Sequence, residues 1–510
     1  MAKRPLLYGA NGKPLTATAW DASSRERRAR QWLPMRSHVN ALLSGDVELI
    51  RARTREEVRR NAWAAKCQTA RVANLVGTGI RPVLELEDRE LERSFMEPWS
   101  DWVNEADADG TSPFYGLQAL ASTAFLEGGD CFVRIRPRRA ADGLTVPLQI
   151  QLLEAEICDP LKNESLPDGT IKAGIDFDLL GRRRFYWMFR SHPDEIVRPF
   201  SDTLQAVPVP ASEVLHLFHV TRPGQVRGVP GLASVLATLH EIHKADDAFL
   251  ARMIIQNLYA TFEEVPTDDS FSVLDNEGDA IGDDDVPEVT AEAGSHVLLP
   301  PGHKVHFGSP PTGAIDHSAF LRDKLRAVAA GSGCLYEQVS GDLSQVNFSS
   351  LRAGLIELRR ELEQIQVNVL IFQLCRPIWR RFIEALILSG RVEMPEPAQL
   401  RRILRPHWQP PGWEYVQPEQ EVKAAVRKIR AGLSSRKREA ARLGIDVEQL
   451  DREIAADNRR AQELGLVFDS DPGTDADGSA RAAAVGDSGG SGEGGGDSAT
   501  GAPESDEEAA

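Results

Sequence analysis

The sequence predicts an α+β fold in which a mainly antiparallel sheet is combined with unusually long helices. Three observations support this prediction: strand-like alternation between residues 110 and 220, helical periodicity from about residue 231, and a later helical stripe whose apolar positions repeat every 3.5 residues. With 510 residues the chain is also too long for one ordinary domain, and we expect about three units.

The composition is that of a globular protein made in a reducing compartment. Hydrophobic residues make up 42% and charged residues 26% of the chain, which excludes wholesale disorder. Apolar runs such as Val369–Leu374 are far shorter than the ~18 residues of a membrane span, and Met1–Arg4 is not followed by the apolar stretch of a signal peptide. The five cysteines are scattered without a CxxC pair, so neither a disulfide framework nor a zinc ribbon is expected.

Net charge is spread unevenly along the chain. Residues 1–80 carry +9 and residues 469–510 carry −10, which leaves −16 of the total −17 for residues 81–468. A domain that grips nucleic acid is normally basic. The acidic body therefore leaves two alternatives: DNA is not a partner, or it is a partner that must not be held.

The N-terminal region is expected to form a basic arm, residues 1–55, followed by a helix. The arginine-rich stretches of this region are either a solvated helix face or a contact for nucleic acid or an acidic partner. Regular apolar spacing without Gly or Pro predicts a helix from Glu56 to Val76. Gly77-Thr-Gly79 ends it and is not a phosphate loop, because no Gly-Lys-Ser/Thr follows.

Residues 56–228 are expected to form an α+β domain around an antiparallel sheet. Alternation of apolar and polar residues predicts strands at Gly128–Arg136, Leu148–Leu153 and Val214–Val220. It also predicts a hairpin of Gly174–Asp178 with Arg184–Phe189, turning at Leu180-Gly181.

Two helices separated by an acidic insert follow. The first is expected from Gly231 to Ala260, within residues 229–262, and spans roughly 45 Å. The insert, residues 263–315, is most acidic between Pro266 and Val289 and ends in short strands near His296–Leu299 and Lys304–Phe307. The second helix, residues 316–331, should begin with Asp316 as its N-cap, and a loop then covers residues 332–348.

The longest helix is expected from about Ser349 to Leu388, within residues 349–417. Its apolar positions step by four and three residues: Leu351, Leu355, Leu358, Leu362, Ile365, Val369 and Phe372. This period is typical of a helix that packs along a neighbouring helix, the alternative being an ordinary core helix of a monomer. Pro377 should kink or break the rod near Gln373, because the proline ring clashes with that carbonyl group.

The C-terminal region is expected to pass from short helices into a disordered tail. Residues 418–467 predict two or three helices, broken at Gly432-Leu433 and Gly444-Ile445. Residues 468–510 consist largely of Gly, Ser, Ala, Asp and Glu and cannot bury enough apolar surface to fold.

No residue pattern in the sequence predicts an enzyme. A GxSxG nucleophile elbow and a GxxxxGK[ST] loop are both missing. Three His-x-x-His pairs begin at His216, His240 and His303, but in a strand such residues point to opposite faces, and His240-Glu-Ile-His243 is one residue short of HExxH. We therefore expect no catalytic residue, no metal site and no cofactor.

Four motifs together resemble the lambda-type portal proteins of tailed bacteriophages. They are, in order, Asn74–Ile80, Leu148–Glu156, Arg222–Gly228 and Asn347–Arg352. The resemblance covers roughly residues 20–465, and the last two motifs (Arg-Pro-Gly-Gln-Val-Arg-Gly and Asn-Phe-Ser-Ser-Leu-Arg) are its most specific parts.

The resemblance implies a ring of identical subunits, usually twelve, at one capsid vertex of the virion. Double-stranded DNA would pass non-specifically through the channel during packaging and ejection, driven by a terminase whose large subunit docks on the ring. A head-tail connector, the major capsid protein and scaffold proteins would be further partners, and no membrane is involved. The subunit itself would be made in the host cytoplasm.

The resemblance also assigns parts to this chain. Residues 56–228 and 349–417 would form the wing, 229–262 and 316–331 the stem helices, 263–315 the clip, 332–348 the tunnel loop and 418–467 the crown. An acidic body with few basic groups near the channel would let DNA slide, because each phosphate contact adds about 0.9 to the logarithmic salt slope.

Three groups of residues are the functional candidates in such a ring. The channel-facing group is Arg322, Lys324, Arg326, Asp342, Ser344, Gln345 and Asn347. A structural turn before the stem is formed by Arg222, Pro223, Gly224, Gln225, Arg227 and Gly228, and the third group is the apolar stripe of the long helix. For the three basic residues of the first group, salt bridges between subunits are the alternative role.

Two other classes of protein were weighed against this interpretation. An enzyme acting on DNA would need a Walker loop or a carboxylate cluster for a metal ion, and the sequence shows neither. Another structural virion protein, such as a tail or minor capsid component, is the second alternative. The order of helix, acidic insert, helix and long rod favours the portal.

Overall fold

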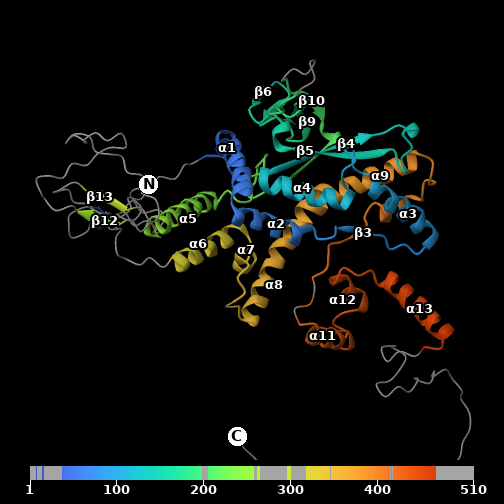
Figure 1. Cartoon of the computed structure of the whole chain (residues 1–510). Coiled ribbons are helices and arrows are strands. Elements are labelled where there is room, and N and C mark those ends of the chain that lie inside the picture. The colour runs from blue at the N-terminus through green and yellow to red at the C-terminus, as the bar shows by residue number, and fades with distance from the viewer. Residues whose placement is uncertain are drawn as a thin grey trace, which may run out of the picture. The chain divides into compact units, whose positions relative to one another are not determined.

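The computed structural model describes residues 37–197, 205–257, 317–344, 346–413, 415 and 417–466, together with four short strands outside these ranges. The chain divides into two compact units, Met1–Ala424 and Ala425–Ala510 (Figure 1). Strands β1 (Leu7–Tyr8) and β2 (Pro14–Leu15) pair antiparallel. The expected N-cap Asp316, the strand Lys304–Phe307, the most acidic part of the insert, Pro266–Val289, and the acidic tail lie outside the described residues.

Two helices, α1 (Val39–Arg60) and α2 (Ala62–Val76), stand where one helix from Glu56 was expected. Asn61 has an extended backbone and separates them, and its Oδ1 accepts hydrogen bonds from the amides of Trp63 and Ala64. Asn is favoured at such an N-cap because it satisfies amides that have no partner within the helix. The expectation of one continuous helix was wrong here, and α1 begins well inside the predicted arm, residues 1–55.

A three-stranded antiparallel sheet in the order β11–β4–β5 forms the centre of the first unit. Its strands, β4 (Asp130–Pro137), β5 (Leu148–Glu154) and β11 (Val214–Phe218), confirm the three strands predicted from alternation. Helix α3 (Arg89–Glu105) packs against α4 (Phe114–Gly128), which in turn packs on β4 and β5.

Both edges of this sheet are hydrogen-bonded to partners that are not strands. On β11, the side-chain amide of Gln373 accepts from the N–H of Phe218 at 2.9 Å and donates to its carbonyl at 3.2 Å. On β5, Ile150 donates to the carbonyl of Ala106 at 2.8 Å and accepts from the N–H of Ala108 at 2.9 Å. The backbone at these positions is therefore paired on both sides.

A second antiparallel sheet has the order β10–β9–β8–β7–β6. The predicted hairpin is confirmed as β8 (Ile175–Asp178) and β9 (Arg183–Met188), with Gly181 in the turn at a φ of +78°. The remaining strands are β6 (Glu164–Leu166), β7 (Gly169–Lys172) and β10 (Val207–Pro210), and a separate pair is formed by β3 (Arg81–Val83) and β14 (His407–Gln409).

The longest helical segment comprises α8 (Phe348–Ile365), a π-helical stretch (Gln366–Cys375) and α9 (Arg376–Leu388). Gln366 and Arg376, at the two junctions, both keep helical backbone angles, so the segment stays helical and the break considered near Gln373 does not occur. The N–H of Arg376 bonds to the carbonyl of Ile371, five residues back. This wider turn places Pro377 in the first turn of α9, where the missing N–H is tolerated.

Two further helices, α5 (Leu236–Asn257) and α6 (His317–Ser332), pack against each other (Figure 1). Their buried side chains, Leu239, Ile242, Leu325 and Val328, share one cluster with Ala64 and Cys67 of α2. A short helix, α7 (Tyr336–Ser340), lies within residues 332–348, the segment that was expected to be a loop. Strand β13 (His296–Leu299), which was predicted, pairs in parallel with β12 (Thr261–Glu264).

The largest core of the first unit contains a group of packed aromatic rings. Trp99 lies in the middle, with ring centroids 5.1 Å from Trp102, 5.3 Å from Phe114, 4.9 Å from Trp379 and 5.0 Å from Phe382. The rings come from α3, α4 and α9, so the far end of the long helix is fixed to the helices that flank the sheet.

Four helices complete the described fold. Helix α10 (Pro397–Ile403) belongs to the first unit, α11 (Pro418–Arg430) leads into the second, and α12 (Arg436–Arg442) and α13 (Val447–Leu464) lie within the second. The predicted breaks are confirmed, because Gly432 and Gly444 adopt φ of +71° and +74° after α11 and α12. Within the described ranges, none of the helices has the length and apolar character needed to cross a bilayer.

Candidate functional site

The turn Arg222–Gly228 is built around a buried carboxylate, Asp130, at the start of β4. Oδ2 of Asp130 accepts from Nε of Arg227 at 2.7 Å, and Oδ1 accepts from the N–H of Gly228 at 2.6 Å. His216 on β11 lies 2.9 Å from Oδ1, and Nη2 of Arg51 on α1 lies 3.5 Å from Oδ2. The turn before α5 is thus connected to the central sheet and to α1 through one side chain.

Arg227 extends this connection to both sheets. Its Nη2 donates to the carbonyl of Ala155 at 2.8 Å, and its Nη1 donates to Ala173 at 3.1 Å and to Cys158 at 3.3 Å. The guanidinium carbon also lies 5.3 Å from the ring centre of Phe132. Since a planar guanidinium offers five donors in a fixed geometry, Arg227 holds three chain segments at once.

The electrostatics of this cluster favour an ionised carboxylate beside a neutral histidine. Burial opposes the ionisation of Asp130, but Arg227, His216 and Arg51 outweigh it and hold the pKa of Asp130 below its usual range. Burial also lowers the pKa of His216 to about 4, against the opposing effect of Asp130. At neutral pH the uncharged imidazole therefore donates through Nε2 to the carboxylate.

Two glycines allow the chain to cross at this point. A Cβ on Gly228 would lie 1.8 Å from the carbonyl oxygen of Gly129, and a Cβ on Gly129, whose φ is +83°, would lie 2.8 Å from the backbone of Gly228. No side chain can occupy either position without moving the backbone. Glycine is required at both positions because the two backbone segments approach each other closely.

The remaining residues of the turn are held mainly by backbone contacts. Oε1 of Gln225, which is buried, accepts from the amides of Thr221 and Arg222, and its Nε2 donates to the carbonyl of Arg227 at 2.8 Å. Asn40 at the start of α1 donates to the carbonyl of Gly224 and accepts from the N–H of Val226. Pro223 is exposed, and Gly224 has a φ of +80°.

The three basic residues proposed to face DNA do not share one side of α6. Arg322 and Arg326 are four residues apart and lie on the same face, whereas Lys324 lies on the opposite one. Nη1 of Arg326 lies 3.5 Å from Oδ1 of Asp323 on the same helix, and its guanidinium carbon lies 5.6 Å from the ring centre of Tyr336 on α7. In the subunit, Arg326 therefore already has a carboxylate partner.

The polar residues of the loop after α7 are engaged in local caps. Asp342 accepts from the N–H and hydroxyl of Ser344, and these bonds, with Arg322 nearby, lower its pKa. Asn347 is the N-cap of α8 and accepts from the N–H of Ser349 at 3.1 Å. Gln345 lies outside the described residues.

The apolar stripe of the long helix is buried in part. Leu358, Leu362, Ile365 and Val369 belong to the largest core, while Leu351 and Leu355 are half-buried. Phe372 is 62% exposed in the single chain, so it does not continue the buried side of the helix within the subunit, and its predicted role in the stripe stays a prediction. In the π-helical stretch the hydrogen bonds close five residues back, which shifts the buried side to Leu370, Ile371, Leu374 and Cys375.

The histidine pairs are placed as structural residues among those that the structure describes. His216 is part of the Asp130 cluster, and His240 lies 3.1 Å from Glu57. One group of possible metal ligands, Glu154, Glu156 and His192, lies at the surface. Arg55 already holds Glu156 at 2.6 Å, and Nδ1 of His192 accepts from a backbone N–H, which places the ring proton on Nε2. The group is therefore better described as an ion-pair cluster.

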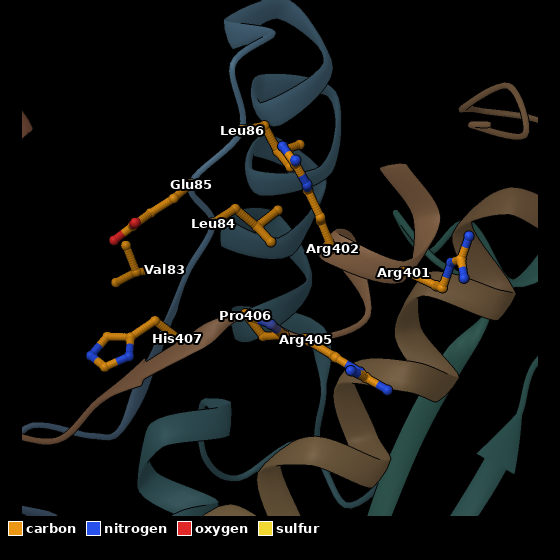
Figure 2. A pocket seen from close by; sticks show the side chains of 9 residues that line it. All are labelled: Val83, Leu84, Glu85, Leu86, Arg401, Arg402, Arg405, Pro406 and His407. Carbon is orange, nitrogen blue, oxygen red and sulfur yellow. The ribbon is translucent and has the colours of Figure 1, made fainter. Parts of the chain in front are cut away.

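A pocket of about 370 Å³ lies between the segment after β3 and the segment from α10 to β14. Figure 2 shows Arg402 directed toward Leu86, while Arg401 and Arg405 point away from the segment that carries Glu85. Nη1 of Arg402 lies 3.2 Å from Glu87, and Nε of Arg401 donates to the carbonyl of Pro397. The pocket is basic but offers no pairing of nucleophile and base within the described residues.

Sequence reasoning missed Asp130, which organises the turn. Its signal is present in the sequence: one acidic residue separates Gly128-Gly129 from the apolar start of a strand. A charge in that position is either exposed or paired in the core, and the structure shows the second case.

Comparison with known proteins gives consistent matches over most of the chain. A family model described as "Phage portal protein, lambda family" matches residues 25–366. The chain is 26% identical to the "Probable portal protein" of Halomonas phage phiHAP-1, over 91% of each chain. It is 22% identical to "Portal protein B" of Escherichia phage lambda, over 86% of this chain and 88% of that protein.

Solved structures similar to this chain come from gene transfer agent particles. "Neck of empty GTA particle computed with C6 symmetry" and "Virion of native gene transfer agent (GTA) particle" each match with a TM-score of 0.40 and 12% identity. Both matches cover 78% of this chain and 93% of the other.

Proposed function

The chain belongs to the lambda family of phage portal proteins, and from this premise we propose that it is the subunit of a ring that conducts double-stranded DNA into and out of the capsid. We propose a dodecamer, as is usual in the family. The ring would occupy one capsid vertex of the virion after synthesis of the subunit in the host cytoplasm. The family is structural, and we propose no catalytic role for this chain.

The observation that carries this proposal is the fixed base of the paired helices α5 and α6. The turn Arg222–Gly228 precedes α5 and is anchored through Asp130, while α6 packs on α2 through Leu325 and Val328. Helices that form a stem must keep their direction relative to the wing, and buried charge pairs and apolar packing at their base supply that rigidity.

The charges around the proposed channel suit a DNA that moves. Residues 317–347 contain three basic side chains, Arg322, Lys324 and Arg326, and three acidic ones, Asp323, Glu337 and Asp342. A balanced surface makes few lasting phosphate contacts, since tight and salt-dependent binding requires an excess of Lys and Arg. Weak contacts by the basic side chains on the channel-facing side of α6 would guide the duplex without holding it.

The other partners follow from the same assignment. Residues 263–315 would form the clip that meets the large terminase subunit during packaging and the head-tail connector afterwards. Residues 56–228 and 349–417 would form the wing that meets major capsid and scaffold proteins, residues 332–348 the tunnel loop, and residues 418–467 the crown.

Mass and symmetry of the purified full chain test the ring. Native mass spectrometry should give a closed multiple of 56.1 kDa, and negative-stain class averages should show a central hole wide enough for duplex DNA. A monodisperse monomer or dimer at micromolar concentration, also in the presence of capsid and scaffold proteins, would refute the proposal.

A packaging assay tests the DNA contacts. Replacing Arg322, Lys324 and Arg326 together with Gln should leave the ring intact and lower the amount of DNA packaged per head. Arg360→Gln is the matched control, because Arg360 is an exposed arginine on α8 that pairs with Glu357 on its own helix. Equal packaging by the triple variant and the control would show that these residues do not contact DNA.

A further inference from the structure

The second unit has helices but lacks a core of its own. Among the described residues 425–466, only Ala425 and Glu439 are buried, and none of these residues belongs to any of the buried hydrophobic clusters. Helix α13 has no buried residue along its whole length. Helices of this length are marginal in water unless an apolar face is covered.

The contacts within this unit are too weak to make up for the missing core. Nη2 of Arg436 lies 3.0 Å from Asp451, and Nζ of Lys437 lies 4.0 Å from Glu448, so two surface ion pairs join α12 to α13. Exposed ion pairs contribute little to stability. A unit of this size normally needs a metal, a disulfide or a partner to remain folded.

Apolar side chains are exposed at both ends of the unit. Near the end of α11, Val426 is 41% and Leu433 is 77% exposed, and at the end of α13, Leu464 is 66% and Leu466 is 50% exposed. Such side chains, rimmed by charges, are typical of surfaces that another protein covers.

The charges of the two ends have opposite sign. Residues 425–446 contain seven basic and two acidic side chains, whereas residues 447–466 contain five acidic and three basic ones. A nucleic acid or an acidic protein would fit only the first end. Because the unit carries both a basic and an acidic end, each with exposed apolar groups, its best complement is another copy of itself placed head to tail.

We propose that residues 425–466 are an interaction surface for a second copy of this chain: the basic end of one copy, with Val426 and Leu433, packs on the acidic α13 of the next, and the unit completes its folding only when this contact forms. The inference rests on the proposed ring, since a head-to-tail contact of this kind closes when the copies are related by rotation. Folding and association of the unit are then one coupled equilibrium.

Hydrogen exchange of the full chain tests the coupling. Monomers and rings are separated by size, and the exchange of amides in residues 425–466 is compared with that in strands β4 and β5. We expect exchange of residues 425–466 to be at least tenfold slower in the ring, with β4 and β5 unchanged. Equal exchange of residues 425–466 in both forms would overturn the inference.

A matched pair of substitutions tests the surface. Leu433→Asp should raise the protein concentration needed for half-maximal ring formation at least tenfold. Leu179→Asp is the control, because Leu179 is 79% exposed in the turn between β8 and β9, and it should change nothing. If the unaltered chain forms no ring, the proposed function fails; if it forms rings and Leu433→Asp assembles as well as the control, only this inference fails.

Discussion

Replacement of Asp130 by Asn should destabilise the first unit more than any surface substitution of an acidic residue. The carboxylate is completely buried, as are the side chains of Arg227 and Arg51 that contact it. Asn keeps one acceptor oxygen and loses the charge. Arg227 then loses its carboxylate partner, and Arg51 keeps only Glu156, whose Oε1 lies 3.6 Å from Nε of Arg51.

The magnitude follows from the geometry. Removing one partner of a buried ion pair costs about 3–5 kcal/mol, because the other charge is left uncompensated. Here the bond to Arg227 measures 2.7 Å and a second cation lies 3.5 Å away, so we expect a loss at the upper end, about 4–5 kcal/mol. A domain's whole stability is about 5–15 kcal/mol, so the variant should be close to unfolding.

Urea unfolding of the full chain, followed by tryptophan fluorescence, is the assay. Trp99, Trp102 and Trp379 lie in the core of the same unit and report its unfolding. Asp168→Asn is the control, because Asp168 is an exposed partner of Arg184 and its loss should not shift the midpoint. A variant at Asp130 that unfolds within about 1 kcal/mol of the unaltered chain would refute the reasoning.

A double variant separates the cost of an unpaired buried charge from the cost of lost contacts in the core. Replacing Arg227 with Met in addition to Asp130→Asn removes one of the stranded cations. The double variant should be more stable than Asp130→Asn alone, because neutral replacement of both partners costs less than breaking the pair. If it is less stable, the loss of the hydrogen bonds from Arg227 to the carbonyls of Ala155, Cys158 and Ala173 outweighs the relief of the unpaired charge.

Three further outcomes are expected in the same unfolding assay. Ile371→Ala should cost about 2–5 kcal/mol and Phe372→Ala no more than about 0.5, since of these two neighbours Ile371 is buried and Phe372 is exposed; the reverse order would mean an ordinary α-helix there. Gly228→Ala should cost about 3 kcal/mol or more, whereas Gly143→Ala, with open space around it, should cost about 1; equal losses would contradict the close crossing. The pKa of His216 falls to about 4 on folding, so the contribution of its neutral imidazole to the free energy of unfolding is complete above about pH 6.5 and is lost as the pH drops toward 4. His216→Gln should therefore make the free energy of unfolding less dependent on pH in that range, and an unchanged pH profile would refute this.

The strands of the central sheet, the β8–β9 hairpin and the helices α5 and α6 could be predicted from sequence because their patterns are local. Residues 148–154 alternate between faces, and α5 repeats its apolar residues at helical spacing. These local patterns specify an element wherever one side meets a core. Glycines with positive φ, such as Gly432 and Gly444, likewise end helices for local reasons.

What could not be predicted depends on contacts between distant segments. Asn61 breaks a helix because its side chain caps the next one, although the apolar pattern continues through it. The π-helical stretch shifts the buried side from Phe372 to Ile371, and a strict count of three and four residues cannot reveal such a shift. Asp130 becomes central only because Arg227, 97 residues later, returns to it. The division into stem, clip and crown, and the residues facing DNA, remain predictions.

The paired edges of the central sheet have a consequence for how copies of the chain meet. An open strand edge invites another chain to add a strand, and identical chains at high concentration then form misassembled dimers or fibres. Here the amide of Gln373 covers β11 at Phe218, the π-helical stretch packs along the same strand, and Ala106 and Ala108 cover β5 at Ile150. At these positions the edge strands have no free backbone groups to offer another chain, which disfavours growth of this sheet from one copy to the next.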